Sequence, residues 1–320
     1  MRYRSIDILR GLAASAVVLA HVNPGFNLGA IGVDIFFVVS GFVMAHVSRH
    51  RTAAQFLTDR AWRIYPVYWA VAVPWILLGL SAGALGLAQA ASSLLLWPAW
   101  WSGLNSLFIG VSWTLAYELA FYLCVAAAVF LRSPAIPLGL FGLALLARPF
   151  SDNILIAFAG HPIAIEFLFG VAIALAPKPQ RIGGGALALG VVWLALFPSA
   201  QFHDFLHNGS ESHGILRLLL WGIPSALIVF GAVCQEECLG RSWTRFPLLL
   251  GAASYSIYLV HSLVVGLVDL AWPIEFALSI ATGVLVWRLA ERPILDYRHR
   301  KRRAARLDEE AARPLRPEAA

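Results

Sequence analysis

The chain has 320 residues, of which 59% are hydrophobic and only 13% are charged, and its mean hydropathy is +0.73. An ordinary soluble domain carries about 25% charged residues, so this composition argues against a soluble protein and indicates a surface covered by membrane lipid. Much of the net charge of +6 lies in one C-terminal run, residues 298–303. A basic run directly after an apolar helix is typical of the cytoplasmic side of a membrane protein, and no aromatic–basic surface accompanies it that would indicate nucleic-acid binding.

Runs of about 20 mainly apolar residues, the length that crosses a bilayer as a helix, predict an all-α polytopic membrane protein with about ten transmembrane helices. The runs lie at 6–22, 29–47, 64–80, 112–131, 134–148, 160–176, 185–198, 215–234, 248–268 and 273–290. We interpret the Gly- and Ala-rich segment 82–101 as interfacial or re-entrant. An eleventh span there would place the basic tail outside the cell, against the positive-inside rule. We therefore expect ten spans with both termini in the cytoplasm.

The chain divides into a membrane domain at 1–295 and a basic tail at 296–320, whose charged, Ala-rich composition predicts disorder. The N-terminus resembles a signal peptide, because basic residues precede an apolar run. However, that run contains Asp7, Arg10 and His21, whereas the apolar part of a signal peptide is short and uncharged. We expect a retained first helix.

Three ionisable side chains in this first helix are the strongest indication of a functional site. His21 lies eleven positions after Arg10, which is about three helical turns, so both side chains share one face about 16 Å apart. Asp7 lies one turn before Arg10 on nearly the same face. Ionisable groups within a membrane face the bundle interior or a cavity. A histidine near a helix end could instead be hydrated at the membrane interface, but the polar stripe beneath His21 favours a functional role.

The next predicted helix places Asp34 in an apolar run, followed by Ser40 and Gly41. A carboxylate beside an imidazole orients the ring and raises its basicity, so we predict that Asp34 orients His21 as a general base. Ser40 and Gly41 have two interpretations, since small residues also permit close helix packing in lipid.

Arg60 and Arg63 share a helix face at i, i+3 spacing. Guanidinium groups bind phosphate oxygens in a bidentate manner, although the same pair could simply anchor the helix on the cytoplasmic side. Farther along, Glu118 follows Trp113 in the fourth span and requires a cavity or a partner. His261 is either a buried core histidine or part of the same polar cavity.

Two further groups have simpler interpretations. Glu291 and the adjacent Arg292 are expected to form an ion pair at a helix end. Histidines and carboxylates also gather in one predicted outer loop, but they lack the HExxH pattern of zinc enzymes, so we predict no metal site; they are His203, Asp204, His207, Glu211 and His213.

Taken together, these motifs resemble the membrane-bound acyltransferase-3 family from about residue 3 to 293. The resemblance is carried by five elements in order: Ser5–Ala14 with Arg10 and His21; Gly32–Phe37 with Ser40-Gly41-Phe42; Arg60 and Arg63 before Ile64-Tyr65-Pro66; Trp113 with Glu118; and Ser254–Leu259 before His261. Within the family the chain looks most like exopolysaccharide acetyltransferases of the succinoglycan type. Many relatives carry a more acidic pattern after the Trp, and some carry a further periplasmic hydrolase-like domain that this chain is not expected to have.

This resemblance implies a bacterial inner-membrane O-acyltransferase. The donor would be acyl-CoA, as a co-substrate rather than a bound cofactor, and the acceptor a cell-surface saccharide or lipid-linked oligosaccharide. It implies that His21 is catalytic, with Asp34 beside it. It further implies that the donor binds to Arg10, Arg60 and Arg63. We predict in addition that the acceptor side is lined by Trp113, Glu118, His261 and Ser40. The competing interpretation is a transporter or flippase for a lipid-linked saccharide, which would also need buried charges along its path; a non-catalytic export scaffold would leave those charges unexplained.

Overall fold

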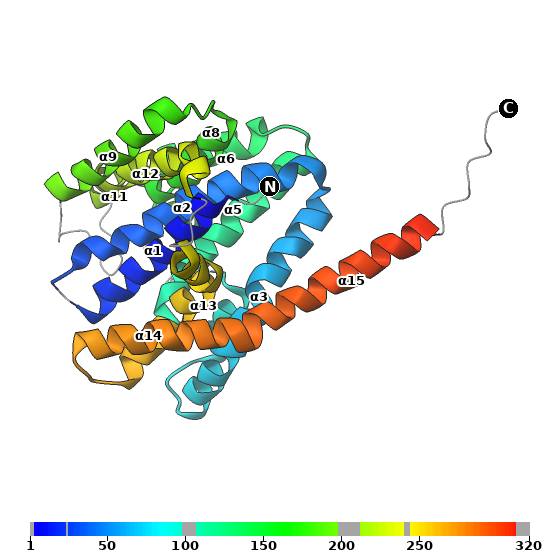
Figure 1. Cartoon of the computed structure of the whole chain (residues 1–320). Helices are drawn as coiled ribbons and strands as arrows, with labels where there is room; N and C mark the ends of the chain where they lie inside the picture. Colours follow the sequence, from blue (N-terminus) through cyan, green and yellow to red (C-terminus); the bar gives the residue numbers. More distant parts are fainter. Residues whose placement is uncertain (1–2, 24, 98–106, 198–211, 240–243, 312–320) are drawn as a thin grey trace.

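The computed structural model describes residues 3–23, 25–97, 107–197, 212–239 and 244–311, and every regular element within these ranges is helical (Figure 1). The α-helices are α1 (Arg4–Val22), α2 (Ile31–Val47), α3 (Ala53–Ser81), α4 (Leu87–Leu95), α5 (Trp113–Phe130), α6 (Ala135–Ala147), α7 (Ile154–Ala159), α8 (Ile165–Leu175), α9 (Gln180–Leu196), α11 (Ser212–Arg217), α12 (Ile223–Cys234), α13 (Arg245–Leu267), α14 (Trp272–Val286) and α15 (Arg292–Ala311). Two π-helical turns, η8 (Leu218–Gly222) and η11 (Trp287–Glu291), join α11 to α12 and α14 to α15. The predicted all-α fold is confirmed.

Eight helical segments are long and apolar enough to cross a membrane by length and composition, at 4–22, 27–50, 53–81, 110–130, 154–175, 214–234, 245–267 and 272–304. Two shorter apolar helices, at 135–150 and 180–196, occupy the positions of the other two predicted spans. Each of the ten predicted segments therefore corresponds to an apolar helix. The protein is a multi-pass membrane protein; the number of complete crossings stays a prediction.

The centre of the bundle is held by close helix pairs. α1 packs along α13 and α2, and α2 packs along α8 (Figure 1). Gly11 of α1 lies against Gly251 of α13, and Gly41 of α2 lies against Gly170 of α8; a Cβ atom at any of these positions would collide with the backbone of the partner helix. Small residues let helices approach closely in lipid, where apolar burial alone gives little driving force. For Gly41, the packing interpretation of the second motif is thus correct.

Segment 82–101 contains a helix that turns back along α3. α4 has nine residues, about 13 Å at 1.5 Å per residue, which is too short to cross a bilayer. Its last carbonyl groups, which have no partner within a helix, accept hydrogen bonds from α3: Tyr68 Oη donates to Ser93 O at 2.7 Å, Trp69 Nε1 to Leu94 O at 2.9 Å and Tyr65 Oη to Leu95 O at 2.8 Å. This geometry agrees with the interfacial or re-entrant interpretation; residues 98–101 lie outside the described ranges.

The tail differs from the expectation of disorder, because α15 continues as a helix to Ala311 and extends well beyond the bundle (Figure 1). Its sequence is rich in Ala, Arg, Leu and Glu, which have high helix propensity. An i, i+4 ion pair also joins Arg292 to Asp296, with 3.7 Å between Nε and Oδ2. Charge composition suggested a disordered tail, and local helix propensity outweighed it. Residues 312–320 of the predicted tail are not described.

Candidate active site

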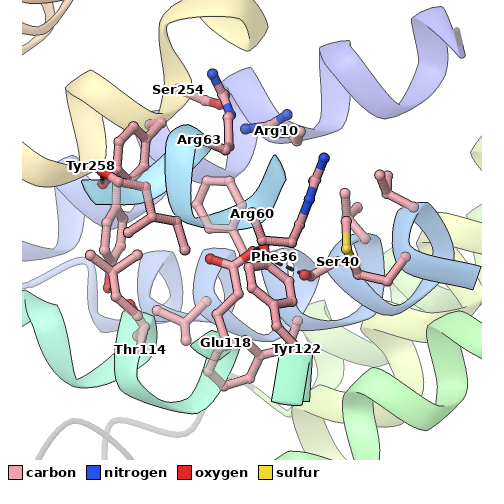
Figure 2. Close-up of a pocket in the computed structure, with 18 residues that line it drawn as sticks. Arg10, Phe36, Ser40, Arg60, Arg63, Thr114, Glu118, Tyr122, Ser254 and Tyr258 are labelled. Atoms are coloured by element: carbon pink, nitrogen blue, oxygen red, sulfur yellow. Dashed lines mark hydrogen bonds between the residues drawn. The ribbon is translucent and has the colours of Figure 1, made fainter. Parts of the chain in front are cut away.

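A polar cavity lies in the middle of the bundle between α1, α2, α3, α5 and α13 (Figure 2). Its cavity volume is about 120 Å³. Its polar lining consists of Arg10, Ser40, Arg60, Arg63, Thr114, Glu118, Tyr122, Ser254, Tyr255 and Tyr258. We call it the arginine cavity, because three guanidinium groups from two helices converge on it.

Two of the three arginines form no ion pair among the described residues. Neither Arg10 nor Arg60 forms a hydrogen bond or ion pair there, and the buried Nε of Arg60 has no hydrogen-bond partner. Arg60 instead lies over the Tyr122 ring, 6.0 Å from its centroid. A guanidinium removed from bulk water without a partner carries a large desolvation cost. The cavity is therefore suited to an anion.

Arg63 is the paired arginine. Its Nη1 donates to Oε1 of Glu291 at 2.5 Å, and Ser256 Oγ donates to Oε2 of the same carboxylate at 2.6 Å. Glu291 is fully buried in η11. The expected Glu291–Arg292 pair is thus wrong, because η11 directs Glu291 inward to α3, whereas Arg292 faces outward and pairs with Asp296.

Glu118 is the only carboxylate among the residues that line the arginine cavity. Its Oε1 accepts hydrogen bonds from Ser40 Oγ at 3.0 Å and from Tyr122 Oη (Figure 2). Both donors hold the carboxylate in one orientation. The sequence analysis did not select Tyr122, although its i+4 spacing from Glu118 on one helix was a usable signal.

Asp34 does not contact His21, contrary to the expectation that it orients the imidazole. Its carboxylate is fully buried and forms a two-point pair with Arg217: Arg217 Nε donates to Oδ1 at 3.1 Å and Nη2 to Oδ2 at 2.7 Å. The fully buried Glu166 of α8 lies beside this pair. Asp34 is on the α2 face that meets α8 and η8, and a guanidinium within reach satisfies a buried carboxylate better than a neutral imidazole. We call these three residues the Asp34 cluster.

His21 is oriented by its own helix. Its Nδ1 is 2.9 Å from the carbonyl oxygen of Val17, one turn earlier in α1. A carbonyl can only accept, so Nδ1 carries the proton and Nε2 is the basic nitrogen of the neutral ring. His21 is solvent-exposed in the bundle, and its ring meets that of His261 edge to face, with centroids 4.8 Å apart.

His261 is fully buried in α13 and has the same tautomer. Its Nδ1 donates to Tyr258 O at 2.6 Å, and its Nε2 has no hydrogen-bond partner among the described residues. The Tyr258 ring, which also lines the arginine cavity, lies 5.6 Å from the His261 ring. A continuous series of rings therefore leads from the cavity through Tyr258 and His261 to His21.

The predicted site residues fall into two regions. Arg10, Ser40, Arg60, Arg63 and Glu118 line the arginine cavity, whereas His21 and His261 form a pair beyond Tyr258. Trp113 stands behind the cavity wall, with its ring 6.2 Å from that of the lining residue Phe37. Arg10 and His21 were expected to face a single hollow; the described cavity is lined by the first and not by the second. Tyr258 closes it on that side, with its Oη 3.0 Å from Thr114 Oγ1.

No group of three or more potential metal ligands occurs within the described ranges. Four members of the predicted outer-loop group, residues 203, 204, 207 and 211, lie outside those ranges. The side chain of the fifth, residue 213, is likewise not described.

A helical membrane bundle with cationic groups around a central cavity and a basic imidazole beyond it is the framework of a membrane-bound group-transfer enzyme. Comparison with known families agrees: the model of the acyltransferase domain of the acyltransferase-3 family matches residues 3–290. The chain therefore belongs to the acyltransferase-3 family.

Individual relatives span most of the chain. It is 32% identical to the exopolysaccharide production protein ExoZ of Rhizobium meliloti (strain 1021), over 90% of this chain and 96% of that protein. It is 28% identical to the putative membrane-bound transacylase BcsY of Komagataeibacter xylinus, over 95% of this chain and 86% of that protein. It is also 26% identical to the peptidoglycan O-acetyltransferase OatA of Listeria monocytogenes serovar 1/2a, over 91% of this chain but only 55% of that protein. No solved structure matches the chain.

Proposed function

We propose that this acyltransferase moves an acetyl or similar short acyl group from acyl-CoA to a hydroxyl of a cell-surface or exopolysaccharide sugar. The observation that carries the proposal is the arginine cavity, in which Arg10 and Arg60 have no carboxylate partner among the described residues. Acyl-CoA combines phosphates, which guanidinium groups bind well, with a long flexible arm that ends in a thioester.

The donor enters from the end of the bundle where α1 and α3 begin, which we assign to the cytoplasm from the positive-inside rule. Arg60 and Arg63 lie about 10 and 15 Å along α3 from that end, and Arg10 lies about 9 Å along α1. In this arrangement Arg60 and Arg63 hold phosphate oxygens, and Arg10 directs the arm along α1 towards His21. Because acyl-CoA is made in the cytoplasm of bacteria, this orientation also matches the bacterial inner membrane.

The transfer itself takes place at His21. Its Nε2 removes the proton from the acceptor hydroxyl, the hydroxyl oxygen attacks the thioester carbonyl carbon, and the C–S bond breaks as the ester C–O bond forms. The proton then passes to the departing thiolate. In the alternative sequence Nε2 attacks the thioester carbonyl carbon, and the C–S bond breaks with departure of the CoA thiolate. The acceptor hydroxyl then attacks the acyl-imidazole, the C–N bond breaks, and the hydroxyl proton passes to the thiolate. Both sequences require the tautomer that the Val17 carbonyl selects.

Tyr258 lies on the route from the arginine cavity to His21. We propose that the thioester passes this side chain when donor is bound, so that Thr114 loses its hydrogen bond to Tyr258 and the cavity extends to the histidine pair. Glu118, Ser40 and the nearby Trp113 then border the side from which the acceptor approaches. The relative ExoZ, named as an exopolysaccharide production protein, supports a sugar acceptor.

Membranes containing the wild-type chain should transfer label from [¹⁴C]acetyl-CoA to surface glycan, and His21→Ala should reduce that rate about 10²–10⁴-fold, the usual contribution of a general base. His46→Ala is the matched control, because His46 is also bonded through Nδ1 to the carbonyl four residues earlier in its helix, at 2.9 Å. Wild-type rates for His21→Ala at normal expression would remove the central role of this residue.

The competing function is a flippase for a lipid-linked saccharide. Such a protein would move the saccharide without incorporating any label, so the same assay separates the two functions. Comparing the surface glycan of a deletion strain with that of its parent would then identify both the acyl group and the acceptor hydroxyl, because one substituent should be missing.

A further inference from the structure

A second basic site adjoins the arginine cavity on α3. Asp59 directly precedes Arg60, and its carboxylate is buried, with only 3% of the side chain exposed. Three guanidinium groups surround it: Arg298 Nη2 at 2.5 Å, and the guanidiniums of Arg51 and Arg302. We call these four residues the Asp59 cluster. Arg298 and Arg302 alone bring two positive charges to the one carboxylate of Asp59, so the cluster carries an excess of positive charge.

One face of the last helix builds this cluster. Glu291, Arg298 and Arg302 lie at i, i+7 and i+11 along η11 and α15, which places them on one stripe of the helix. The stripe faces α3, because Glu291 pairs with Arg63 and the two arginines pair with Asp59. Within the described residues, neither Arg298 nor Arg302 has another carboxylate partner. The helix that leaves the bundle in Figure 1 is thus attached along its first part to the helix that carries Arg60 and Arg63.

An aromatic ring stands beside the cluster. Trp62 is 40% exposed, and the Arg298 guanidinium lies over its ring, 5.1 Å from the centroid. On α3, Trp62, Asp59, Arg63 and Arg60 follow one another around about 160° of the helix surface at 100° per residue. The Asp59 cluster and the arginine cavity are therefore adjacent parts of one surface, with the cluster nearer the start of α3.

We propose that the Asp59 cluster and Trp62 bind the 3′-phosphoadenosine end of acyl-CoA, an inference that rests on the proposed donor. The order of groups in acyl-CoA is thioester, flexible arm, diphosphate, then adenosine with a 3′-phosphate. With the diphosphate at Arg60 and Arg63, the adenosine extends outward along α3 to the cluster. The doubly charged 3′-phosphate matches the excess charge there, and the exposed indole offers a face on which adenine stacks.

The test compares two donors that differ only at this group. For wild-type protein in vesicles, kcat/KM should be about tenfold higher for acetyl-CoA than for acetyl-3′-dephospho-CoA, the scale of one charge-assisted hydrogen bond. In Arg298→Ala/Arg302→Ala this ratio should fall to about one. Adenosine 3′,5′-bisphosphate should also inhibit the double variant about tenfold less strongly than wild type.

The matched control is Arg300→Ala/Arg303→Ala, which removes the same charge from the exposed, opposite side of α15 and should keep the wild-type ratio. Because the readout is a ratio within one protein, partial loss of folded enzyme does not imitate the result. Arg298→Lys/Arg302→Lys, which retains the charge, should keep most of the discrimination.

A double Ala variant that keeps the wild-type ratio would overturn the proposal. A second result would also overturn it: kcat/KM falls equally for both donors in the double Ala variant, and this fall disappears when phosphatidylglycerol is omitted from the vesicles. That result would assign the arginines to anionic lipid headgroups. Failure of the proposed function looks different: the wild type itself would then transfer acetyl from neither donor.

Discussion

The arginine cavity and the Asp34 cluster are both groups of charged side chains inside the same apolar bundle, and they differ in how their charges are matched. In the cavity, Arg10 and Arg60 form no ion pair with a carboxylate among the described residues. In the cluster, the carboxylate of Asp34 accepts two hydrogen bonds from Arg217, and Asp34, Arg217 and Glu166 are each at most 1% exposed. The cavity therefore holds guanidiniums that an anionic ligand can pair, whereas the guanidinium of the cluster is already paired with Asp34.

This difference separates function from architecture among charges that look alike in the sequence. A charge inside a membrane marks a candidate functional site. The buried pair at Asp34, however, also joins α2 to the end of α11, which continues through η8 into α12. Variants of the two regions should therefore fail in different ways. The cluster should control whether the bundle forms, and the cavity should control what the formed bundle does.

The largest effect is expected from Arg217→Ala. It leaves Asp34 and Glu166 buried with no cation between them, and breaking a buried pair in this way costs about 3–5 kcal/mol. The protein should accumulate poorly in membranes and unfold at a lower temperature in detergent. Thermal unfolding of the purified variant checks this directly.

A second substitution provides the control for this expectation. Asp34→Asn combined with Arg217→Met removes both charges of the pair, so the double variant should recover about 2 kcal/mol of the loss seen for Arg217→Ala. Equal instability of the single and double variants would show that Arg217 stabilises the bundle through packing on Trp221 rather than through charge.

Arg10→Ala should give the opposite pattern. Removing a half-buried cation that forms no ion pair should leave thermal stability unchanged or slightly raised, while kcat/KM for acyl-CoA should fall about 10–100-fold, as expected for loss of a charged hydrogen bond to the donor. Arg181→Ala, at an exposed site in α9, is the control. A loss of stability comparable to that of Arg217→Ala would erase the distinction between the two regions.

The smallest effect is expected from Tyr122→Phe, which removes one of the two hydrogen bonds to Glu118. One such bond contributes about 1 kcal/mol, so the melting temperature should fall by a few degrees and Ser40 should still hold the carboxylate. Differential scanning calorimetry of Tyr122→Phe and of Tyr122→Phe/Ser40→Ala measures the two contributions. A fall as large as that of Arg217→Ala would place Glu118 among the architectural charges.

Most of the fold follows from local patterns in the sequence. Apolar runs locate the helices, although α3 begins at Ala53, eleven residues before the predicted start at 64. Helical spacing places Arg60 with Arg63 on one side of α3. The same spacing argument placed Arg10 and His21 on one face of α1. It could not reveal that Tyr258, 237 residues after His21 in the chain, stands between the cavity and the imidazole.

The partners of the buried charges were the least predictable feature. Asp34 pairs with a residue 183 positions away and Arg63 with one 228 positions away. Nothing in either local sequence specifies these partners, because they depend on which helix faces are brought together by tight contacts such as Gly41 against α8. The signal that was available is the presence of Arg217 in an apolar run: a buried guanidinium requires a buried carboxylate nearby.

The glycine contacts have a consequence for movement. Gly11 and Gly251 lie at one close contact between helices, and Gly41 and Gly170 lie at another. Sliding α1 along α13, or α2 along α8, would therefore bring a larger side chain into collision with the backbone of the partner helix. The four helices form one stiff frame, and the spacing of the histidine pair is set within it. A transporter that exposes its substrate alternately to each side of the membrane needs two halves that move relative to each other. With a stationary core, the proposed transfer would carry only the small acyl group across, at one fixed position.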